Sequence, residues 1–301
     1  MTQSEAKLLE GKPLAQAIQA DLAKQVAALK AAGHPLKMVT VEVGIDQSSK
    51  VYVKRQGDAC RKIDIEHTVM SLDPKIPQAD LLAQIEALNR DPGVSGIILQ
   101  LPLPQHLVSG AAQEHLDPSK DVEGVHPENL GRLLGGLPVC APPTALAAFE
   151  LIKAGVKAAT GSSKLRGMEA VVVGRSQIVG RPLALMLLAE SCTVTICHTG
   201  TRDLGVQTRR GEILVVAAGK ARLIRGEMIK PGAIVVDVGT NSEEAGGKWS
   251  LVGDVEFASA KTVAGWLSPV PGGVGPLTVM MLLRNLVLSA EKKAGLGIGK
   301  S

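Results

Sequence analysis

Two kinds of periodicity alternate along the first hundred residues of the chain. Apolar residues recur at spacings of three and four from residue 12 to residue 32, which is typical of a helix with one buried face, and Gly33 and Pro35 then end it. We expect strands at 38–43, 65–72 and 96–100, and helices at 12–32, from about residue 50, and at 78–89. Strands that alternate with helices indicate a parallel sheet, so this part of the chain is predicted to be α/β.

The same alternation returns after an irregular stretch between residues 116 and 143. We expect helices at 144–154, 181–190, 201–209 and 279–288, and strands at 169–173, 192–197, 213–217 and 233–238. The chain is therefore predicted to form two α/β domains, at residues 1–145 and 146–275. The apolar helix near the C-terminus, at about 276–292, is expected to return to the first domain and close it.

The strand at 169–173 leads into a turn that predicts a ligand. It is apolar, as suits the buried centre of a parallel sheet, and ends at Gly174 before a helix that contains Pro182. The first backbone amides of such a helix form a site for a phosphate, so a dinucleotide is expected here. The usual G-x-G-x-x-G pattern is incomplete, because Ser176 replaces the second glycine and the last falls at Gly180. The alternative is a tight turn without a ligand.

The end of the next strand indicates which dinucleotide binds. An NAD-specific fold normally carries an Asp or Glu there, which binds the ribose 2′-hydroxyl. This chain has no acid at that place. It has His198, Thr199 and Arg202, which are able to donate hydrogen bonds to a 2′-phosphate together with Arg175 and Ser176. NADP is therefore favoured over NAD, against the alternative that these are ordinary polar loop residues.

Composition narrows the class of protein. Hydrophobic residues make up 45% of the 301 and aromatic residues only 2%, so the cores must be built from aliphatic side chains, as is common where helices cover parallel strands. The formal charge of +4 is mild, and no Lys/Arg run is interleaved with aromatic residues. A nucleic-acid partner is therefore not expected.

The cysteines and the N-terminus bear on metal binding and location. Cys60, Cys140, Cys192 and Cys197 show no C-x-x-C spacing, so we expect reduced thiols and no metal site. The first residues lack the basic and apolar regions of a signal peptide, and no apolar run reaches the roughly 20 residues of a membrane span. We expect a cytoplasmic protein without a membrane partner.

Polar residues at the ends of the first domain's strands mark a second candidate site. Ligands of parallel sheets collect beyond the carboxyl ends of the strands, and Ser48, Tyr52 and Gln100 all lie at such ends. Tyr52 is the only tyrosine in the chain. The alternative is that it is an amphipathic residue at the edge of a core.

Four stretches of the sequence together resemble one family. They are Val43-Gly44 with Ser48 and Tyr52, residues 96–104 (GIILQLPLP), residues 174–182 (GRSQIVGRP) and residues 269–276 (PVPGGVGP). In this order they are similar to the methylenetetrahydrofolate dehydrogenase/cyclohydrolase family, FolD, over nearly the whole chain. The resemblance implies a folate cleft between two α/β domains, a Rossmann-type NADP-binding C-terminal domain and a homodimer.

The family oxidises the methylene bridge between N5 and N10 of tetrahydrofolate by hydride transfer to NADP, and then hydrolyses the methenyl cation to 10-formyltetrahydrofolate. The resemblance implies four candidate catalytic residues, Tyr52, Gln56, Gln100 and Glu123. The candidate folate-binding residues are Ser48, Tyr52, Leu99, Gln100, Leu101, Asp121, Glu123, Pro271, Gly272, Gly273, Val274 and Gly275. The candidate NADP-binding residues are Gly174, Arg175, Ser176, Ile178, Val179, His198, Thr199 and Thr240.

The sequence departs from the family pattern at one catalytic position. The family has a lysine four residues after the tyrosine, one helical turn on, which assists water attack and proton movement during hydrolysis. This chain has Gln56 there, and Lys54 and Arg55 lie about 160° and 60° away around the helix. An amide does not exchange a proton near neutral pH, so we expect dehydrogenase activity with weak or absent cyclohydrolase activity.

Two alternatives remain open from the sequence. The chain could be the full bifunctional enzyme, with Gln56 positioning the water, or a folate- and NADP-binding paralogue without catalysis. The intact phosphate turn argues against the second alternative. A further change, Glu123 in place of the family's pterin-binding aspartate, keeps the charge and reaches one methylene further, so it bears on which folate is bound.

Overall fold

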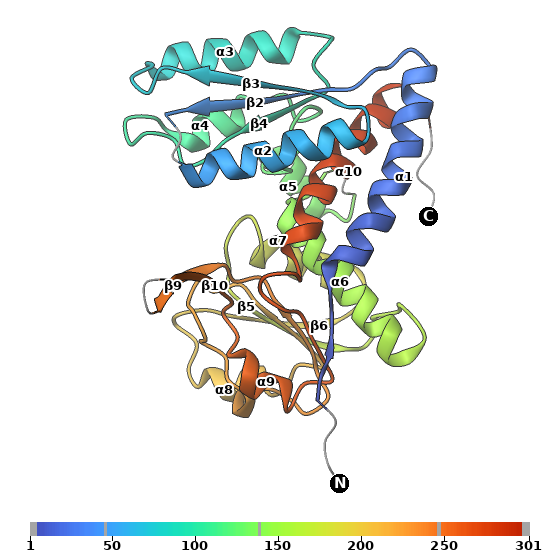
Figure 1. Ribbon diagram of the computed structural model, residues 1–301, viewed down its shortest axis with the longest axis vertical. Helices are drawn as coiled ribbons and strands as arrows, with labels where there is room; N and C mark the ends of the chain where they lie inside the picture. Colours follow the sequence, from blue (N-terminus) through green and yellow to red (C-terminus); the bar gives the residue numbers. More distant parts are fainter. Residues whose placement is uncertain (1–4, 45–46, 138–139, 246–247, 297–301) are drawn as a thin grey trace. The chain divides into compact units, whose positions relative to one another are not determined.

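The computed structural model describes residues 5–44, 47–137, 140–245 and 248–296 (Figure 1). The chain divides into two compact units, each with a parallel sheet of its own. Residues 1–15 and 144–278 make up the first, which we call the nucleotide unit. Residues 16–143 and 279–301 make up the second, the folate unit.

The nucleotide unit is built on a six-stranded parallel sheet in the order β1-β11-β8-β7-β5-β6. Its strands are β1 (Lys7–Leu8), β5 (Glu169–Val173), β6 (Thr193–Cys197), β7 (Ile213–Val216), β8 (Ile234–Asp237) and β11 (Trp266–Leu267). Its helices are α6 (Pro143–Thr160), α7 (Gly180–Ala189), α8 (Leu204–Thr208) and α9 (Phe257–Lys261), with a 3-10 turn at Gly226–Met228. The central strands β7 and β8 are buried along their whole length, and β5, whose apolar run predicted a buried strand, is buried at all but its first residue.

The first residues of the chain belong to the nucleotide unit, although we expected them in the N-terminal domain. Strand β1 pairs with β11 in parallel, Lys7 opposite Trp266 and Leu8 opposite Leu267. Ala6 is buried in the same core as β5, β7 and β8. This pairing was missed because a two-residue strand has no periodicity to read.

An antiparallel hairpin follows the sheet of the nucleotide unit and was also missed. Its strands are β9 (Asn241–Ala245) and β10 (Lys248–Val252). They are rich in charged and polar residues, and Trp249 is 71% exposed. Because the hairpin has no buried face, its sequence lacks the alternating apolar pattern that predicts a strand.

The folate unit is built on a three-stranded parallel sheet in the order β3-β2-β4. Its strands are β2 (Lys37–Val43), β3 (Glu66–Leu72) and β4 (Gly96–Leu99), and its helices are α2 (Gln47–Lys62), α3 (Gln78–Arg90), α4 (Ser109–Glu114) and α5 (Pro127–Leu134). Two long helices, α1 (Gly11–Ala31) and α10 (Gly275–Lys293), contribute most of their length to this unit. The amide of Asn285, on α10, donates to the carbonyl oxygens of Val122 and Ala141, both at 2.8 Å.

The two faces of this sheet have different chemistry. Helices α2 and α3 lie on opposite sides of it (Figure 1). Val39, Val41 and Val43 of β2 form a hydrophobic core with α3. The alternate residues of β2 face the other side, and one of them, Thr40, contacts Gln56 of α2. The face under α2 therefore carries buried polar groups.

Candidate active site

Two glycines close the turn between β5 and α7. Gly174 has φ = +124°, which favours glycine, and a Cβ on it would lie 2.1 Å from the Ala217 carbonyl oxygen. A Cβ on Gly180 would lie 2.1 Å from the Gly174 carbonyl oxygen. The backbone thus turns where no side chain fits, and α7 begins at the second of these glycines. A tight turn that leads into the start of a helix exposes backbone amides that are able to bind a phosphate.

A pocket of about 540 Å³ opens at this turn, beyond the carboxyl ends of β5, β6 and β7. It is lined by Val173, Gly174, Arg175, Ser176, His198, Thr199, Thr201, Leu204, Ala217, Ala218, Lys220 and Leu223. Five of the eight predicted NADP-binding residues are among them. The cations Arg175 and Lys220 line the pocket, and none of its described lining residues is acidic. Glycines that leave room for a backbone contact, with cations nearby, fit a dinucleotide that carries an extra phosphate.

The remaining predicted NADP-binding residues do not line this pocket. Ile178 is 51% exposed, Val179 is buried at the start of α7, and Thr240 is exposed beyond β8. The other seven lining residues were not predicted, and two of them, Thr201 and Lys220, have polar side chains. Lys220 follows the end of β7, so the strand-end logic that found His198 after β6 could have found it too.

Two buried carboxylates brace the loops next to the pocket, and neither was predicted. Asp254 accepts hydrogen bonds from the backbone amides of Ala218 (2.6 Å) and Gly219 (2.8 Å), just after β7. Asp237, at the end of β8, accepts from three backbone amides, including that of Asp254 at 3.0 Å. Burial nevertheless raises the pKa of Asp237 to about 6. These bonds hold the residues that form one wall of the pocket.

Tyr52 and Gln56 lie one turn apart on α2 in the folate unit, so they share one face of the helix. Gln56 is completely buried and Tyr52 is half-buried, whereas Lys54 and Arg55 are exposed. Burial raises the pKa of Tyr52, and the negative charge of Glu123 adds to the rise, which the Gln56 side chain opposes by hydrogen bonding. The site therefore contains a tyrosine, an amide and a carboxylate within interaction range.

Glu123 lies in the segment that runs beside β4, where Ile97 forms a parallel bridge with Asp121. Burial raises the pKa of Glu123 to about 8, the charge of Asp121 contributes further, and a hydrogen bond with the Leu99 backbone works in the opposite direction. At neutral pH this carboxyl group therefore holds a proton and is able to donate a hydrogen bond.

Replacing Glu123 by glutamine tests this pKa. The folded protein keeps a proton that the unfolded chain releases, so the free energy of unfolding falls as the pH rises from about 4.5 to about 8. A full one-proton difference gives about 1.4 kcal/mol per pH unit, and water access to the half-buried side chain keeps the slope below that. We expect the urea concentration at the unfolding midpoint to fall less steeply with pH between 5 and 8 in Glu123→Gln than in the unsubstituted protein. Glu114→Gln, at an exposed position, should leave this pH dependence unchanged. An equal slope in both variants would contradict this assignment.

Asp121 is engaged within the folate unit. Its Oδ2 accepts from the backbone amide of His126 at 2.8 Å and from Asn129 Nδ2 at 2.9 Å, and burial raises its pKa. Its Oδ1 has no hydrogen-bond partner among the described residues. Only Oδ1 of Asp121 is therefore free for the predicted folate-binding role, because Oδ2 is engaged in fixing the start of α5.

The residues at the end of β4 face different ways. Leu99 is 2% exposed, and its side chain packs in the core with α3, so only its backbone remains for the site. Gln100 is half-buried, and its side-chain nitrogen donates to the Leu101 carbonyl oxygen at 3.2 Å. Leu101 is 38% exposed. Ser48 lies in the first turn of α2, and its side chain falls outside the described part of the chain.

The predicted folate loop at residues 271–275 belongs to the nucleotide unit, where it is packed against the start of α1. The Gly11 amide donates to the Gly272 carbonyl oxygen at 2.9 Å, and a Cβ on Gly11 would lie 1.9 Å from the Gly273 carbonyl oxygen. Gly272 has φ = +118°. The loop is therefore held in one conformation by contacts that larger residues would break.

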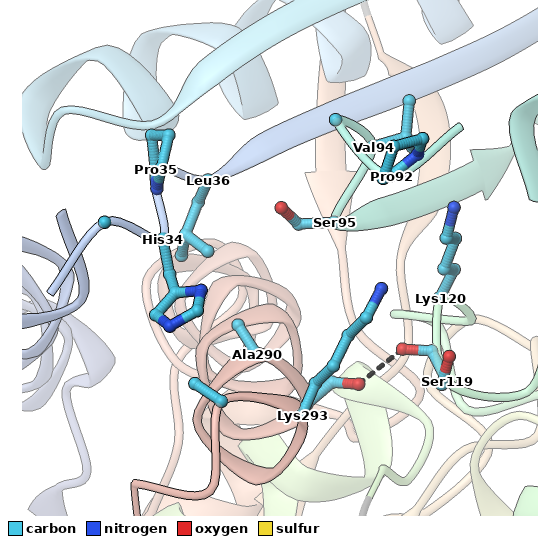
Figure 2. Close-up of a pocket in the computed structure, with 14 residues that line it drawn as sticks. His34, Pro35, Leu36, Pro92, Val94, Ser95, Ser119, Lys120, Ala290 and Lys293 are labelled. Atoms are coloured by element: carbon cyan, nitrogen blue, oxygen red, sulfur yellow. Dashed lines mark hydrogen bonds between the residues drawn. The ribbon is translucent and has the colours of Figure 1, made fainter. Parts of the chain in front are cut away.

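Another pocket, of about 330 Å³, lies at the amino ends of the strands of the folate unit, away from the carboxyl ends where the predicted site residues lie (Figure 2). Its walls include Leu36 and Ser95, next to the amino ends of β2 and β4. Lys120 is 3% exposed there and donates to three backbone carbonyl oxygens at the end of α3, at 2.6 to 2.8 Å. No predicted site residue lines this pocket, and its buried cation already has its partners. We assign it no ligand.

The described residues form neither a membrane-spanning helix nor a metal site. No described helix is long and apolar enough to span a membrane. Within residues 5–44, 47–137, 140–245 and 248–296, no group of three His, Cys, Asp or Glu side chains is arranged to hold a metal ion. The four cysteines are free and buried, and burial raises the pKa of Cys60 and Cys140 to about 12.

The phosphate turn, its pocket and the second parallel unit with polar strand ends define a nucleotide-binding α/β protein of the dehydrogenase type. A family profile described as the NAD(P)-binding domain of tetrahydrofolate dehydrogenase/cyclohydrolase matches residues 142–294, and one described as its catalytic domain matches residues 9–123. The chain therefore belongs to the tetrahydrofolate dehydrogenase/cyclohydrolase family, which confirms the family resemblance of its motifs.

Individual relatives agree with this assignment. The bifunctional protein FolD of Bordetella avium is 47% identical over 287 residues, which cover 95% of this chain and 98% of the relative. The crystal structure of the bifunctional enzyme FolD from Campylobacter jejuni is 42% identical, with a TM-score of 0.90 over 96% of this chain and 99% of that one. The Trypanosoma brucei enzyme, solved with NADP and an inhibitor, is 35% identical, with a TM-score of 0.88 over 96% and 98%.

Proposed function

We propose that this protein oxidises 5,10-methylenetetrahydrofolate to 5,10-methenyltetrahydrofolate by hydride transfer to NADP, and that it hydrolyses the methenyl product only weakly. Family membership over both units supports the first part. The observation that carries the second part is Gln56, which is buried and uncharged one helical turn from Tyr52.

NADP is supported by the nucleotide unit and by a relative. Arg175 and Lys220 line its pocket without an acidic neighbour among the described lining residues, which suits a 2′-phosphate. The Trypanosoma brucei relative was solved in complex with NADP. NADP supplies a nicotinamide ring that accepts the hydride.

Hydride transfer makes modest demands on the folate unit. The methylene carbon loses a hydrogen with its bonding electron pair, and the cation that remains is the methenyl product, so no side chain has to move a proton. Tyr52 packs against the folate rings, Gln100 lies beside the reacting carbon, and Glu123 donates a hydrogen bond to the pterin while it holds its proton. The absence of a lysine charge beside the developing cation favours this step.

Hydrolysis makes a different demand. Water must add to the methenyl carbon, and the bond from that carbon to N5 must break. Both protons must leave the water oxygen, one going to N5 and the other to solvent. Gln56 hydrogen-bonds but does not accept a proton near neutral pH. General acid–base assistance typically contributes about 10²- to 10⁴-fold, which sets the expected loss.

The alternative is a fully bifunctional enzyme that makes 10-formyltetrahydrofolate, and the names of the relatives favour it, because they are called bifunctional. Gln56 is the observation on the other side. A homodimer and a cytoplasmic location also remain proposals, the first resting on the family resemblance and the second on the sequence.

A paired assay on one sample tests the proposal. We expect NADPH to form from methylenetetrahydrofolate, and the methenyl absorbance to decay at close to its spontaneous rate. Rapid enzymatic decay of the methenyl absorbance supports the bifunctional alternative. Saturable NADP binding without turnover of any folate supports a non-catalytic paralogue.

A further inference from the structure

Three polar side chains form a chain beneath α2, behind the predicted folate site. Thr40, on β2, and Gln56, on α2, are both completely buried. The Thr40 hydroxyl donates to Gln56 Oε1 at 3.5 Å and lies 2.9 Å from His67 Nε2 on β3. The chain of contacts therefore runs from a half-buried histidine to the residue that replaces the family lysine.

A helix glycine makes room for this histidine. Gly57 lies in the interior of α2, where glycine destabilises a helix relative to alanine. A Cβ on Gly57 would lie 2.9 Å from His67 Nδ1, which is too close. Glycine at position 57 therefore destabilises the helix but leaves space for the imidazole ring of His67.

The hydrogen bond from Thr40 to Gln56 gives the hydrogens of this chain a direction. The pKa of His67 is lowered by burial, so its ring is neutral near pH 7 and carries one hydrogen. Because the single Thr40 hydrogen goes to Gln56 Oε1, Thr40 accepts from His67 Nε2. This leaves the amide nitrogen of Gln56 on the side away from Thr40.

That nitrogen is a buried donor that needs an acceptor. It has no partner of ordinary hydrogen-bond geometry among the described residues. The Tyr52 hydroxyl is near enough for the Gln56 side chain to lower the Tyr52 pKa by hydrogen bonding, so the nitrogen lies on the Tyr52 side. Buried donors are almost always paired, because an unpaired one is costly. A ligand that stacks near Tyr52 is placed to supply the acceptor.

We propose that Thr40 and His67 are positioning residues that fix the Gln56 side chain with its amide nitrogen facing the folate site, where it donates a hydrogen bond to an acceptor atom of the reduced pterin substrate. This inference rests on the proposed function for the identity of the ligand. Held in this way, the Gln56 side chain is a neutral hydrogen-bond donor of fixed orientation, whereas a lysine at this position supplies a mobile cation.

A double-mutant cycle tests the coupling. We expect Thr40→Val and His67→Phe each to lower kcat/KM for methylenetetrahydrofolate by about 3- to 10-fold, the scale of one hydrogen bond, without changing the KM for NADP. Thr40→Ser keeps the hydroxyl and is expected to restore activity. Gln56→Met keeps the shape of the side chain but removes the amide. In that background, neither Thr40→Val nor His67→Phe should lower kcat/KM any further. Equal losses in both backgrounds would overturn the proposal, because they indicate a merely structural role.

A second measurement separates this inference from the proposed function. The side-chain amide signals of Gln56 in a ¹⁵N-labelled sample are identified by their loss in Gln56→Met. We expect them to shift in Thr40→Val and His67→Phe, and again when 5-formyltetrahydrofolate is added, but not in the exposed control Thr68→Val on β3. If the protein turns over no folate yet the signals respond to both substitutions and to the probe, the proposed function fails and the positioning stands. Signals that ignore both substitutions overturn the positioning.

Discussion

Substituting Gln56 by lysine is expected to accelerate hydrolysis of methenyltetrahydrofolate by about 10²- to 10⁴-fold, the contribution of a general acid–base group. Position 56 is completely buried, so a lysine there loses solvation and its pKa falls from its usual value. A lysine whose pKa approaches neutrality is able to exchange a proton with water at the methenyl carbon. The measurement is the decay of the methenyl absorbance above its spontaneous rate.

The same substitution is expected to leave oxidation of methylenetetrahydrofolate unchanged or slower, because it adds a positive charge beside a developing cation. Val51→Lys is the matched control, since it places a lysine on the same helix at a position that is 53% exposed. The control should alter neither rate. The hypothesis that Gln56 limits hydrolysis is wrong if the unsubstituted protein already hydrolyses methenyltetrahydrofolate as fast as Gln56→Lys does.

The parts of the site that follow from a repeating geometry could be predicted from the sequence. A helix repeats every 3.6 residues, so Gln56 had to share a face with Tyr52 while Lys54 and Arg55 did not. The strand-turn-helix joint at Gly174 was equally readable, because an apolar run, a glycine and a helix start are all local signals.

Other parts depend on register between distant segments, which no local pattern contains. Thr40 meets His67 because β2 and β3 pair with Met38 opposite His67, which brings together residues 27 positions apart. Asp254 reaches the amides after β7 across a comparable separation. A buried Asp or Thr in a sequence shows only that a partner must exist, and the fold decides which one.

Alanine at Gly174 is expected to raise the dissociation constant for NADP at least 100-fold. The substitution combines two faults: φ = +124° is unfavourable for alanine, and the new Cβ would lie 2.1 Å from the Ala217 carbonyl oxygen. Because that oxygen belongs to a wall of the pocket, relieving the clash must move either the wall or the turn. Both changes withdraw the backbone from the phosphates it is proposed to bind.

Gly167→Ala is the matched control for the backbone strain alone. Gly167 also has a positive φ, +82°, and lies in the same unit, but a Cβ on it would meet nothing within 4 Å. We expect both variants to lower the melting temperature without ligand, but only Gly167→Ala to keep the upward shift that NADP produces, since a ligand stabilises the folded state only if it still binds. Calorimetric titration with NADP gives the two dissociation constants. If Gly174→Ala binds NADP within about threefold of the unsubstituted protein, the phosphates do not bind at this turn, because the clash and the strained φ together must displace its backbone.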